Sequence, residues 1–479
     1  MERCILSCLV GEFRMASASS DLQSRARNWV RAHAPFLVVV IVAAFVWSIV
    51  FNMAATDFLT GGHRPFRAAW LGTGHFDLFG LTVPYNFEGW ADYDFYYVSW
   101  ADQFLAGYLP YTSHFEVQII NDWVYYQPYF YPPLFLYTCV LGRLLPFQPF
   151  GIGMVLTSFG FLTVFPVYGI ARYLNSHWLS GALAASIYLF NPVVLYYTAY
   201  LWLNPAPFVF FVTLSFFLLI KNHRTAGVLS MVTAVLFKQI ALFFAIPVVA
   251  LILMWTATND RVFLKRTFKI PSFRGLLNAS IAPLLLACLL SLPYILDPVN
   301  YLYYLFLRPG TVHLSSYSDL PGPTRPITSA VVLIVLSAPE VLVQVVDFLQ
   351  YSYILLLVGI IPLFWLMLKS NKTPHDSVSF WKHLLLLAFL IVVWVHIGSP
   401  RGIYKYYMVA LIPFTSVLPT WKTPAANAQM PSLLKTVGSV LFSVLILLVD
   451  RNLYILVLVA VIIIYLASVV HRIVKARHS

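Results

Sequence analysis

Two acids, Asp92 and Asp94, stand in a segment dense in aromatic residues, 89–100. A carboxylate can act as a general base and take the proton of a sugar or alcohol hydroxyl. The neighbouring rings of Trp90 and Tyr93 offer flat faces on which a sugar can stack. Acids are costly to keep beside a bilayer, so this pair is the first candidate for chemistry. The alternative is a solvated loop whose aromatic residues anchor it at the membrane interface.

A lysine, Lys238, interrupts an apolar run at Phe237-Lys-Gln-Ile240. A lysine at membrane depth is costly and needs a partner. Its ammonium can hold a phosphate or pair with a buried acid. It can also extend along its apolar stem toward the membrane surface, which would be a purely structural role.

Two more cations, Arg401 and Lys405, lie in an aromatic segment between two apolar runs. They are four residues apart and share one face if the segment is helical. An arginine binds two phosphate oxygens at once and a lysine adds a point charge, so the pair predicts a phosphate site. The alternative is binding to lipid headgroups.

Other polar groups of the same region have a simpler interpretation. The sequence around Asp102 predicts a short amphipathic surface helix that ends at Gly107, with Asp102 on its polar face. The prolines of Tyr131-Pro-Pro-Leu134 fix the start of a helix, and alone they indicate a rigid turn. No convincing metal-ligand spacing is present among the acids and histidines, and no cofactor is expected, although a divalent ion held by carboxylates is left open.

The composition indicates which elements must position these groups. The 479 residues are 60% hydrophobic and only 10% charged, against about 25% charged in a soluble domain. Long apolar runs rather than alternation favour helices over the strands of a barrel. The fold class is therefore an all-α polytopic membrane protein. The net charge of +12 comes mainly from basic residues between apolar runs, where it sets topology and does not indicate nucleic acid.

We expect about twelve transmembrane helices and a large first external loop with short surface helices. A span needs about 20 apolar residues. The predicted spans are 36–53, 150–171, 179–200, 205–220, 226–238, 240–256, 277–295, 350–368, 383–398, 404–420, 433–449 and 453–471. Residues 226–256 can also form one broken helix, and residues 133–146 are too short to span.

Basic clusters then orient the chain, because cytoplasmic connections are enriched in lysine and arginine. We predict a cytoplasmic segment at 1–34, a catalytic membrane domain at 35–420 and C-terminal membrane helices at 421–479. The external loops are 54–132 and 296–349. The candidate site then lies on the external or lumenal side of a plasma membrane, archaeal or bacterial, or of the endoplasmic reticulum membrane.

The motifs, in their order along residues 36–420, resemble the GT-C superfamily of integral-membrane glycosyltransferases. Trp90-Ala-Asp92-Tyr93-Asp94 stands where the branch that uses dolichyl-phosphate glucose has Gly-Asp-Tyr-Glu, with Ala91 in place of the glycine. The Tyr-Pro-Pro-Leu and Phe-Lys-Gln motifs of that branch match Tyr131 to Leu134 and Phe237 to Gln239.

A second branch of the superfamily, the mannosyltransferases that build glycolipid anchors, is also similar. Its Asp pair followed by Gly-x-x-Pro-Tyr resembles Asp94 and the segment Gly107 to Tyr111. The two branches differ over which acid is the base. The order Asp-Tyr-acid favours Asp92, and Asp94 is the alternative.

The resemblance implies an inverting transfer of a hexose, glucose or mannose, from a polyprenyl- or dolichyl-phosphate donor to a lipid-linked glycan or another acceptor. Asp92 or Asp94 would be the base. It also implies that the donor phosphate is bound by Arg401, Lys405 and Lys238. The substrate would contact Trp90, Tyr93, Tyr131, Gln239 and Tyr404. The alternatives are a transporter or flippase of lipid-linked sugars, and a transferase of the protein O-mannosyltransferase kind.

Overall fold

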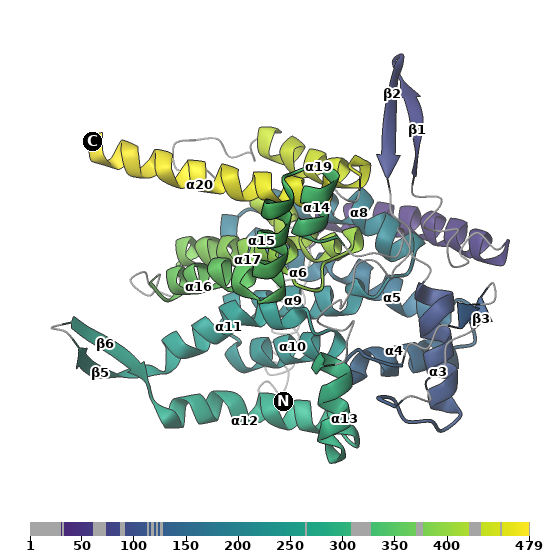
Figure 1. Cartoon of the computed structure of the whole chain (residues 1–479), viewed down its shortest axis with the longest axis horizontal. Coiled ribbons are helices and arrows are strands. Elements are labelled where there is room, and N and C mark those ends of the chain that lie inside the picture. The colour runs from purple at the N-terminus through teal and green to yellow at the C-terminus, as the bar shows by residue number, and fades with distance from the viewer. Residues whose placement is uncertain are drawn as a thin grey trace, which may run out of the picture.

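Apolar helices make up most of the described chain (Figure 1). The computed structural model describes residues 30, 33–60, 73–86, 92–112, 115, 119–120, 123–124, 128–263, 266–307, 327–369, 377–420, 433–450 and 453–478. Within these ranges the strands form three separate antiparallel pairs. They are β1 (Thr73–Leu78) with β2 (Leu81–Asn86), β3 (Ile119–Ile120) with β4 (Trp123–Val124), and β5 (Ala257–Phe263) with β6 (Arg266–Pro271).

Four helical stretches of the described chain are long and apolar enough to cross a membrane, or up to six if each of two bent pairs is one span. The four are His33–Leu59, Gly151–Asn175, α12 (Phe273–Ser291) and α17 (Val378–Gly398). The bent pairs are Leu179–Leu189 with Pro192–Tyr200, and Glu340–Tyr351 with Ile354–Lys369. The chain is therefore an all-α integral membrane protein, while the predicted count of about twelve spans is not confirmed.

Shorter helices account for the difference in count. The apolar ones of 10–17 residues are α4 (Pro133–Leu144), α9 (Pro205–Ile220), α10 (Arg224–Phe237), α11 (Ala241–Thr256) and parts of α19 (Leu433–Leu448) and α20 (Tyr454–His478). The long stretches divide into α5 (Gly151–Leu162) and α6 (Val164–Asn175), α7 (Trp178–Leu189), α8 (Pro192–Val194) and η2 (Leu195–Tyr200), and α15 (Glu340–Tyr351) and α16 (Ile354–Lys369). Among the remaining helices of the described chain are η1 (Tyr93–Tyr97), α3 (Val98–Leu105), η3 (Tyr294–Leu296), α13 (Pro298–Leu302), η4 (Tyr303–Leu307) and α14 (Ser329–Val335).

The predicted span 404–420 is not a continuous helix. It is built from η7 (Lys405–Ala410), α18 (Ile412–Val417) and η8 (Leu418–Thr420), and nearly all of it is buried. Irregular backbone is tolerated at membrane depth only where protein encloses it, since lipid cannot satisfy free peptide groups. The peptide groups of this segment form short-range hydrogen bonds with one another, such as those from Tyr407 to Tyr404 at 3.0 Å and from Leu411 to Met408 at 2.8 Å, while the surrounding protein encloses it.

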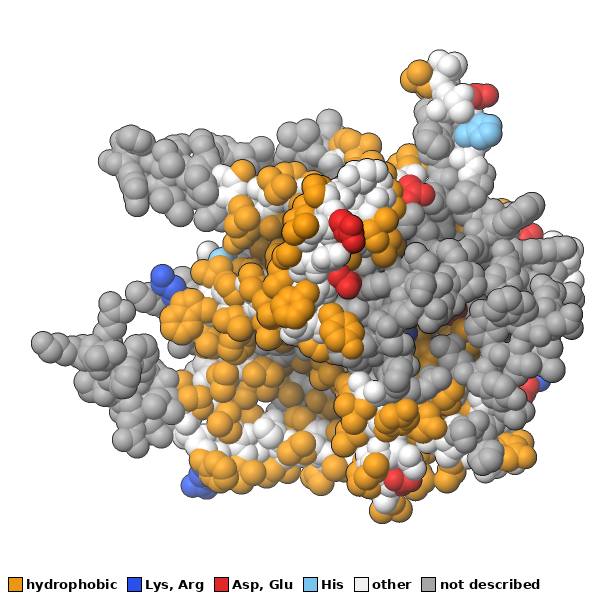
Figure 2. Space-filling model, in the orientation of Figure 1, with side chains coloured by type: hydrophobic (Ala, Val, Ile, Leu, Met, Phe, Trp, Pro, Cys, Tyr) orange, Lys and Arg blue, Asp and Glu red, His pale blue; other side chains and the backbone are white. Residues whose placement is uncertain are grey.

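Lipid-compatible surface covers the side of the molecule that carries α15 and α16. Figure 2 shows hydrophobic side chains over much of the described part of this face, with few charged groups among them. On α16, Val358, Ile361 and Trp365 are each about 60% exposed. Such exposure of large apolar side chains is costly in water and favourable against acyl chains.

The two ends of the helix assembly carry different connections. Figure 1 shows the β5–β6 hairpin and the C-terminal end of α20 on the left, and α3 with β3 on the right. The basic cluster that includes Arg261 and Lys269 belongs to that hairpin. The acid-bearing first loop and this basic connection therefore lie at opposite ends.

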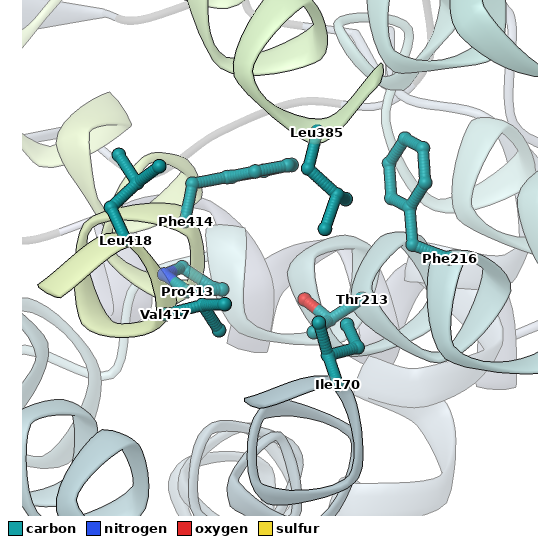
Figure 3. Close-up of a pocket in the computed structure, with 8 residues that line it drawn as sticks. All are labelled: Ile170, Thr213, Phe216, Leu385, Pro413, Phe414, Val417 and Leu418. Atoms are coloured by element: carbon teal, nitrogen blue, oxygen red, sulfur yellow. The ribbon is translucent and has the colours of Figure 1, made fainter. Parts of the chain in front are cut away.

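A small apolar cavity lies in the core between α6, α9, α17 and α18 (Figure 3). Thr213 contributes a hydroxyl to its lining, and this hydroxyl donates to the carbonyl of Val209 at 2.7 Å. The rest of the lining is hydrocarbon, including Ile170, Phe216 and Leu385. We interpret this cavity as a gap in packing, because it holds no group that can bind or react.

We predict that Gly153→Ala destabilises the protein. Gly153 lies on α5 against the ring of Trp202, and a Cβ there would come within 2.7 Å of a ring carbon. Trp202 is fully buried and has a φ of 51°, so it cannot move aside easily. Overpacking of this kind costs about 1–3 kcal/mol, which a lowered melting temperature in detergent would reveal.

Gly438→Ala on α19 is the matched control, because its Cβ would meet no atom within 4 Å. This variant should melt at the wild-type temperature or slightly above, since alanine favours a helix over glycine. Equal melting temperatures for both variants would contradict the packing described for Trp202.

Candidate functional site

Asp92 lies directly before η1, a π-helical turn, in the segment between the first apolar helix and α4. Single π-turns are rare and occur frequently at functional sites. The hydroxyl of Tyr97, at the end of η1, donates a long hydrogen bond of 3.4 Å to Asp92 Oδ2. Tyr97 is fully buried while Asp92 is half-buried. The carboxylate therefore lies at the edge of the core, next to the buried hydroxyl of Tyr97.

Lys238 occupies a break between two helices. α10 ends at Phe237, α11 begins at Ala241, and Lys238 has an extended backbone with φ −156° and ψ 133°. Residues 226–256 thus lie in two short helices with a break between them, and this pair is not among the bent pairs that pass as one span. The break turns the side chain inward, where it is only 3% exposed.

The ammonium of Lys238 is enclosed by polar and aromatic groups. It donates to Asn204 Oδ1. Its Nζ also lies 5.4 Å from the ring centre of Tyr131, 5.2 Å from that of Tyr406 and 4.3 Å from that of Tyr407. Aromatic faces attract a cation, and more strongly when it is desolvated. These aromatic rings and the amide oxygen take the place of the water that the lysine loses on burial.

Arg401 supplies a second cation beside the first. It follows α17 in a turn, with its guanidinium carbon 5.7 Å from the ring centre of Phe130. The turn is fixed by an antiparallel bridge between Ile403 and Ile327, whose peptide groups exchange hydrogen bonds of 2.9 and 2.7 Å. Arg401 is half-buried, so its guanidinium is positioned and still accessible.

Both cations line one cavity of about 260 Å³. Gln239, Ser399 and the rings of Tyr353 and Tyr407 add polar groups to it. The remaining lining is apolar and comes from α11, η4, α16, α17 and the turn after it: Ile240, Leu242, Phe243, Leu305, Phe306, Leu356, Val395, Pro400, Gly402 and Ile403. The cavity therefore joins two positive charges to a hydrocarbon surface, which suits an anionic lipid.

The charges of this cluster act on one another. Burial raises the pKa of the Asp92 carboxyl to about 6, against the opposing effects of Lys238, the Tyr97 hydrogen bond and Arg401. A carboxylate with such a pKa is ionised at neutral pH and is a stronger base than an ordinary aspartate. A perturbed acid beside two cations in a partly enclosed site is a pattern typical of catalytic centres.

Of the predicted site residues, the structure brings together Asp92, Tyr131, Lys238, Gln239 and Arg401. Gln239 donates to the carbonyls of Phe130 and Leu305, so it connects the Tyr131 segment to η4. Tyr404 is half-buried and stacks on Tyr406 with ring centres 5.8 Å apart. Trp90 and the side chain of Asp94 lie outside the described residues.

The structure does not bring Lys405 or Tyr93 to this cluster. The fully buried ammonium of Lys405 donates to the carbonyls of Leu447 and Val449, at the end of α19. Arg401 and Lys405 do not share a helical face, because Gly402, with a φ of 75°, and the Ile403 bridge exclude a helix there.

Tyr93 is buried in packing contacts, with its ring 4.8 Å from that of Trp202. Asp102 fulfils the surface role expected of it: α3 ends before Gly107, and Asp102 Oδ1 accepts a bond of 2.6 Å from Arg143. Within the described ranges, no group of three or more histidine, cysteine or acidic residues is arranged to hold a metal.

Asn204, Tyr97, Tyr406 and Tyr407 contribute to the site, and the sequence did not single them out. Asn204 precedes Pro205 at the start of α9, just as Asn191 precedes Pro192 at the start of α8. Both patterns indicate a helix start, so the sequence holds no signal that separates the asparagine at the site from the structural one.

No protein-family model matches the chain, and a search of curated proteins found no match. Among solved structures it is similar to the apo crystal structure of the Archaeoglobus fulgidus oligosaccharyltransferase, with a TM-score of 0.36 and 14% sequence identity. The similarity covers 88% of this chain and 55% of that one, so the chain spans about half the length of that protein.

We predict that Asp92→Asn removes a pH-dependent loss of stability. The folded-state pKa of about 6 lies above the value of about 3.9 for an unfolded aspartate, so the folded protein binds more protons between these values and loses stability as pH rises. Relative to Asp92→Asn, the wild type should lose roughly 2–3 kcal/mol of unfolding free energy between pH 4 and pH 7.

Denaturant unfolding of both proteins in one detergent at several pH values measures this difference. The difference in unfolding free energy between the two proteins isolates the effect of Asp92, because other groups titrate equally in both. A gap that stays constant from pH 4 to pH 7 would show that the Asp92 carboxyl is not held in the environment described.

Proposed function

We propose that this chain is a glycosyltransferase of the membrane that transfers a hexose from a polyprenyl- or dolichyl-phosphate donor. The observation that carries the proposal is the cavity of about 260 Å³ that holds Lys238 and Arg401 in an otherwise largely apolar lining. Asp92 lies close enough for both cations to lower its pKa. The motif order that resembles the GT-C superfamily supports the same function independently.

The donor phosphate would lie between Arg401 and Lys238. Arginine can bind two phosphate oxygens, and Arg401 lines the cavity. Leu242 and Phe243 of α11 and Leu356 of α16 would contact the first isoprene units of the lipid. A lipid monophosphate matches this combination of charge and hydrocarbon better than a soluble nucleotide sugar, which needs polar contacts along its length.

The proposed reaction is one displacement at the anomeric carbon. The Asp92 carboxylate takes the proton of an acceptor hydroxyl while the oxygen attacks that carbon. The bond from the carbon to the phosphate oxygen breaks, and its electron pair leaves with the lipid phosphate. Arg401 and Lys238 stabilise the charge that develops there. A single displacement inverts the anomeric centre. Because the two cations stabilise the leaving phosphate, the proposed reaction does not require a metal.

The acceptor in this proposal is a hydroxyl of a lipid-linked glycan or of another carbohydrate at the external or lumenal face. Asp92 belongs to the segment between the first apolar helix and α4. The sequence analysis predicts that this segment lies on the external side of the membrane. In this proposal the hydroxyl approaches the Asp92 carboxylate from the side away from Tyr97. Asp94 stays the alternative base.

Purified wild type should consume polyprenyl-phosphate glucose or mannose when membrane glycolipid extract supplies the acceptor. Asp92→Asn should lower kcat by a factor on the order of 10²–10⁴, the usual contribution of a general base. Below a pH of about 6 the wild-type rate should fall, because protonation of Asp92 removes the base. Radiolabelled sugar transfer measures each of these rates.

Asp102→Asn is the matched control, since Asp102 lies in the same loop and pairs with Arg143 on the surface. It should retain the wild-type rate. Loss of transfer in Asp94→Asn but not in Asp92→Asn would assign the base to Asp94. Consumption of neither donor by the wild type would refute the transferase, and movement of the donor across vesicles without turnover would indicate a transporter.

A further inference from the structure

Asn204 is linked by hydrogen bonds to Lys238 directly and to Asp92 through Tyr97. Its Oδ1 accepts from the ammonium of Lys238. Its Nδ2 donates to the hydroxyl of Tyr131 at 2.8 Å, and its backbone N–H donates to the hydroxyl of Tyr97 at 3.2 Å. Tyr97 in turn donates to Asp92. One residue, only 2% exposed, thus joins the groups on which the chemistry depends.

The fold fixes this residue by its backbone. The turn between η2 and α9 has Trp202 in the left-handed region, and the N–H of Leu203 donates to the carbonyl of Tyr197 at 3.0 Å. Pro205 then begins α9. Because the turn is held on both sides, the amide of Asn204 presents its oxygen and nitrogen in defined directions.

An amide suits this place because it accepts and donates at once and carries no charge. A carboxylate in its position could also accept from Lys238 and from Tyr131, but it would neutralise the lysine. A neutral acceptor instead holds the ammonium and leaves its positive charge free to act on other groups.

We infer that Asn204 is a positioning residue that sets the charge balance of the site, because it holds the ammonium of Lys238 through a neutral acceptor and holds Tyr97 as the donor to Asp92. Any effect of the Lys238 charge on a donor phosphate rests on the proposed function. The effect of Asn204 on the titration of Asp92 is independent of that function, because it can be measured in the protein without substrate.

Asp92 provides the readout. The titratable or charged groups of the described chain that act on it are Tyr97 on η1, Lys238 in the break after α10, Arg401 after α17, Tyr131 before α4 and Tyr406 on η7. Lys238 and Arg401 are the cations in this set. A change that neutralises Lys238 must therefore alter the titration of Asp92.

Asn204→Asp should raise the pH midpoint of Asp92 by about one unit or more, because it adds a like charge and neutralises Lys238. Asn204→Ala should lower the midpoint, because the ammonium loses its neutral acceptor and pairs with the Asp92 carboxylate instead. Shifts of the Asp92 midpoint in opposite directions distinguish a charge effect from a general loosening of the site. If one variant does not fold, the other still tests the inference.

Asn191→Asp is the matched control. Asn191 is equally buried and also precedes a proline, but its side chain accepts from the N–H of Val193 and donates to Ser443. A substitution there disturbs a helix start without touching Lys238 or Tyr97. It should leave the midpoint of Asp92 unchanged even if it lowers the melting temperature.

The experiment is an infrared titration of the carboxyl band in full-length protein in detergent, with no donor present. Each spectrum is corrected by subtracting that of the same protein carrying Asp92→Asn, so that only Asp92 contributes. A midpoint that equals the wild-type value in folded Asn204→Asp or Asn204→Ala, or that shifts alike in Asn191→Asp, overturns the inference. The predicted shifts in a protein that transfers no sugar would uphold it while refuting the proposed function.

Discussion

Burial of one positive charge is the constraint on which this site depends. The ammonium of Lys238 is 3% exposed in a protein whose surroundings are mostly hydrocarbon. Desolvating an ammonium costs several kcal/mol unless nearby groups replace water. Here one amide oxygen and the rings of Tyr131, Tyr406 and Tyr407 replace it. The nearby Asp92 supplies the opposite charge, so acid and cation stabilise each other's ionised form across the site.

Each irregular element near the site serves this enclosure. The break between α10 and α11 turns Lys238 inward, the π-turn η1 holds Asp92, and the left-handed Trp202 fixes the turn that carries Asn204. The buried 3₁₀ segment η7 brings Tyr406 and Tyr407 over the ammonium. Regular helices satisfy their own peptide groups, whereas these segments need the surrounding protein, and that need places them in its interior.

The sequence predicted the membrane class, most helix positions and five of the clustered residues. Asp92, Lys238 and Arg401 could be found because charge is costly in an apolar chain and is retained only for a reason. Lys405 shows the limit of spacing: four residues share a face only in a helix, and Gly402 with the Ile403 bridge prevents one. Asn204 was not predictable, because its contacts come from segments far apart in the chain: Tyr97, Tyr131 and Lys238.

A cryo-electron microscopy structure with bound polyprenyl monophosphate would test the central claim most directly, namely that Lys238 and Arg401 form a site for a lipid phosphate facing Asp92. The account predicts phosphate density within hydrogen-bonding distance of Arg401 and next to Lys238, with the lipid chain along Leu242, Phe243 and Leu356. Density for the lipid elsewhere, with this cavity filled only by solvent at saturating lipid, would contradict it.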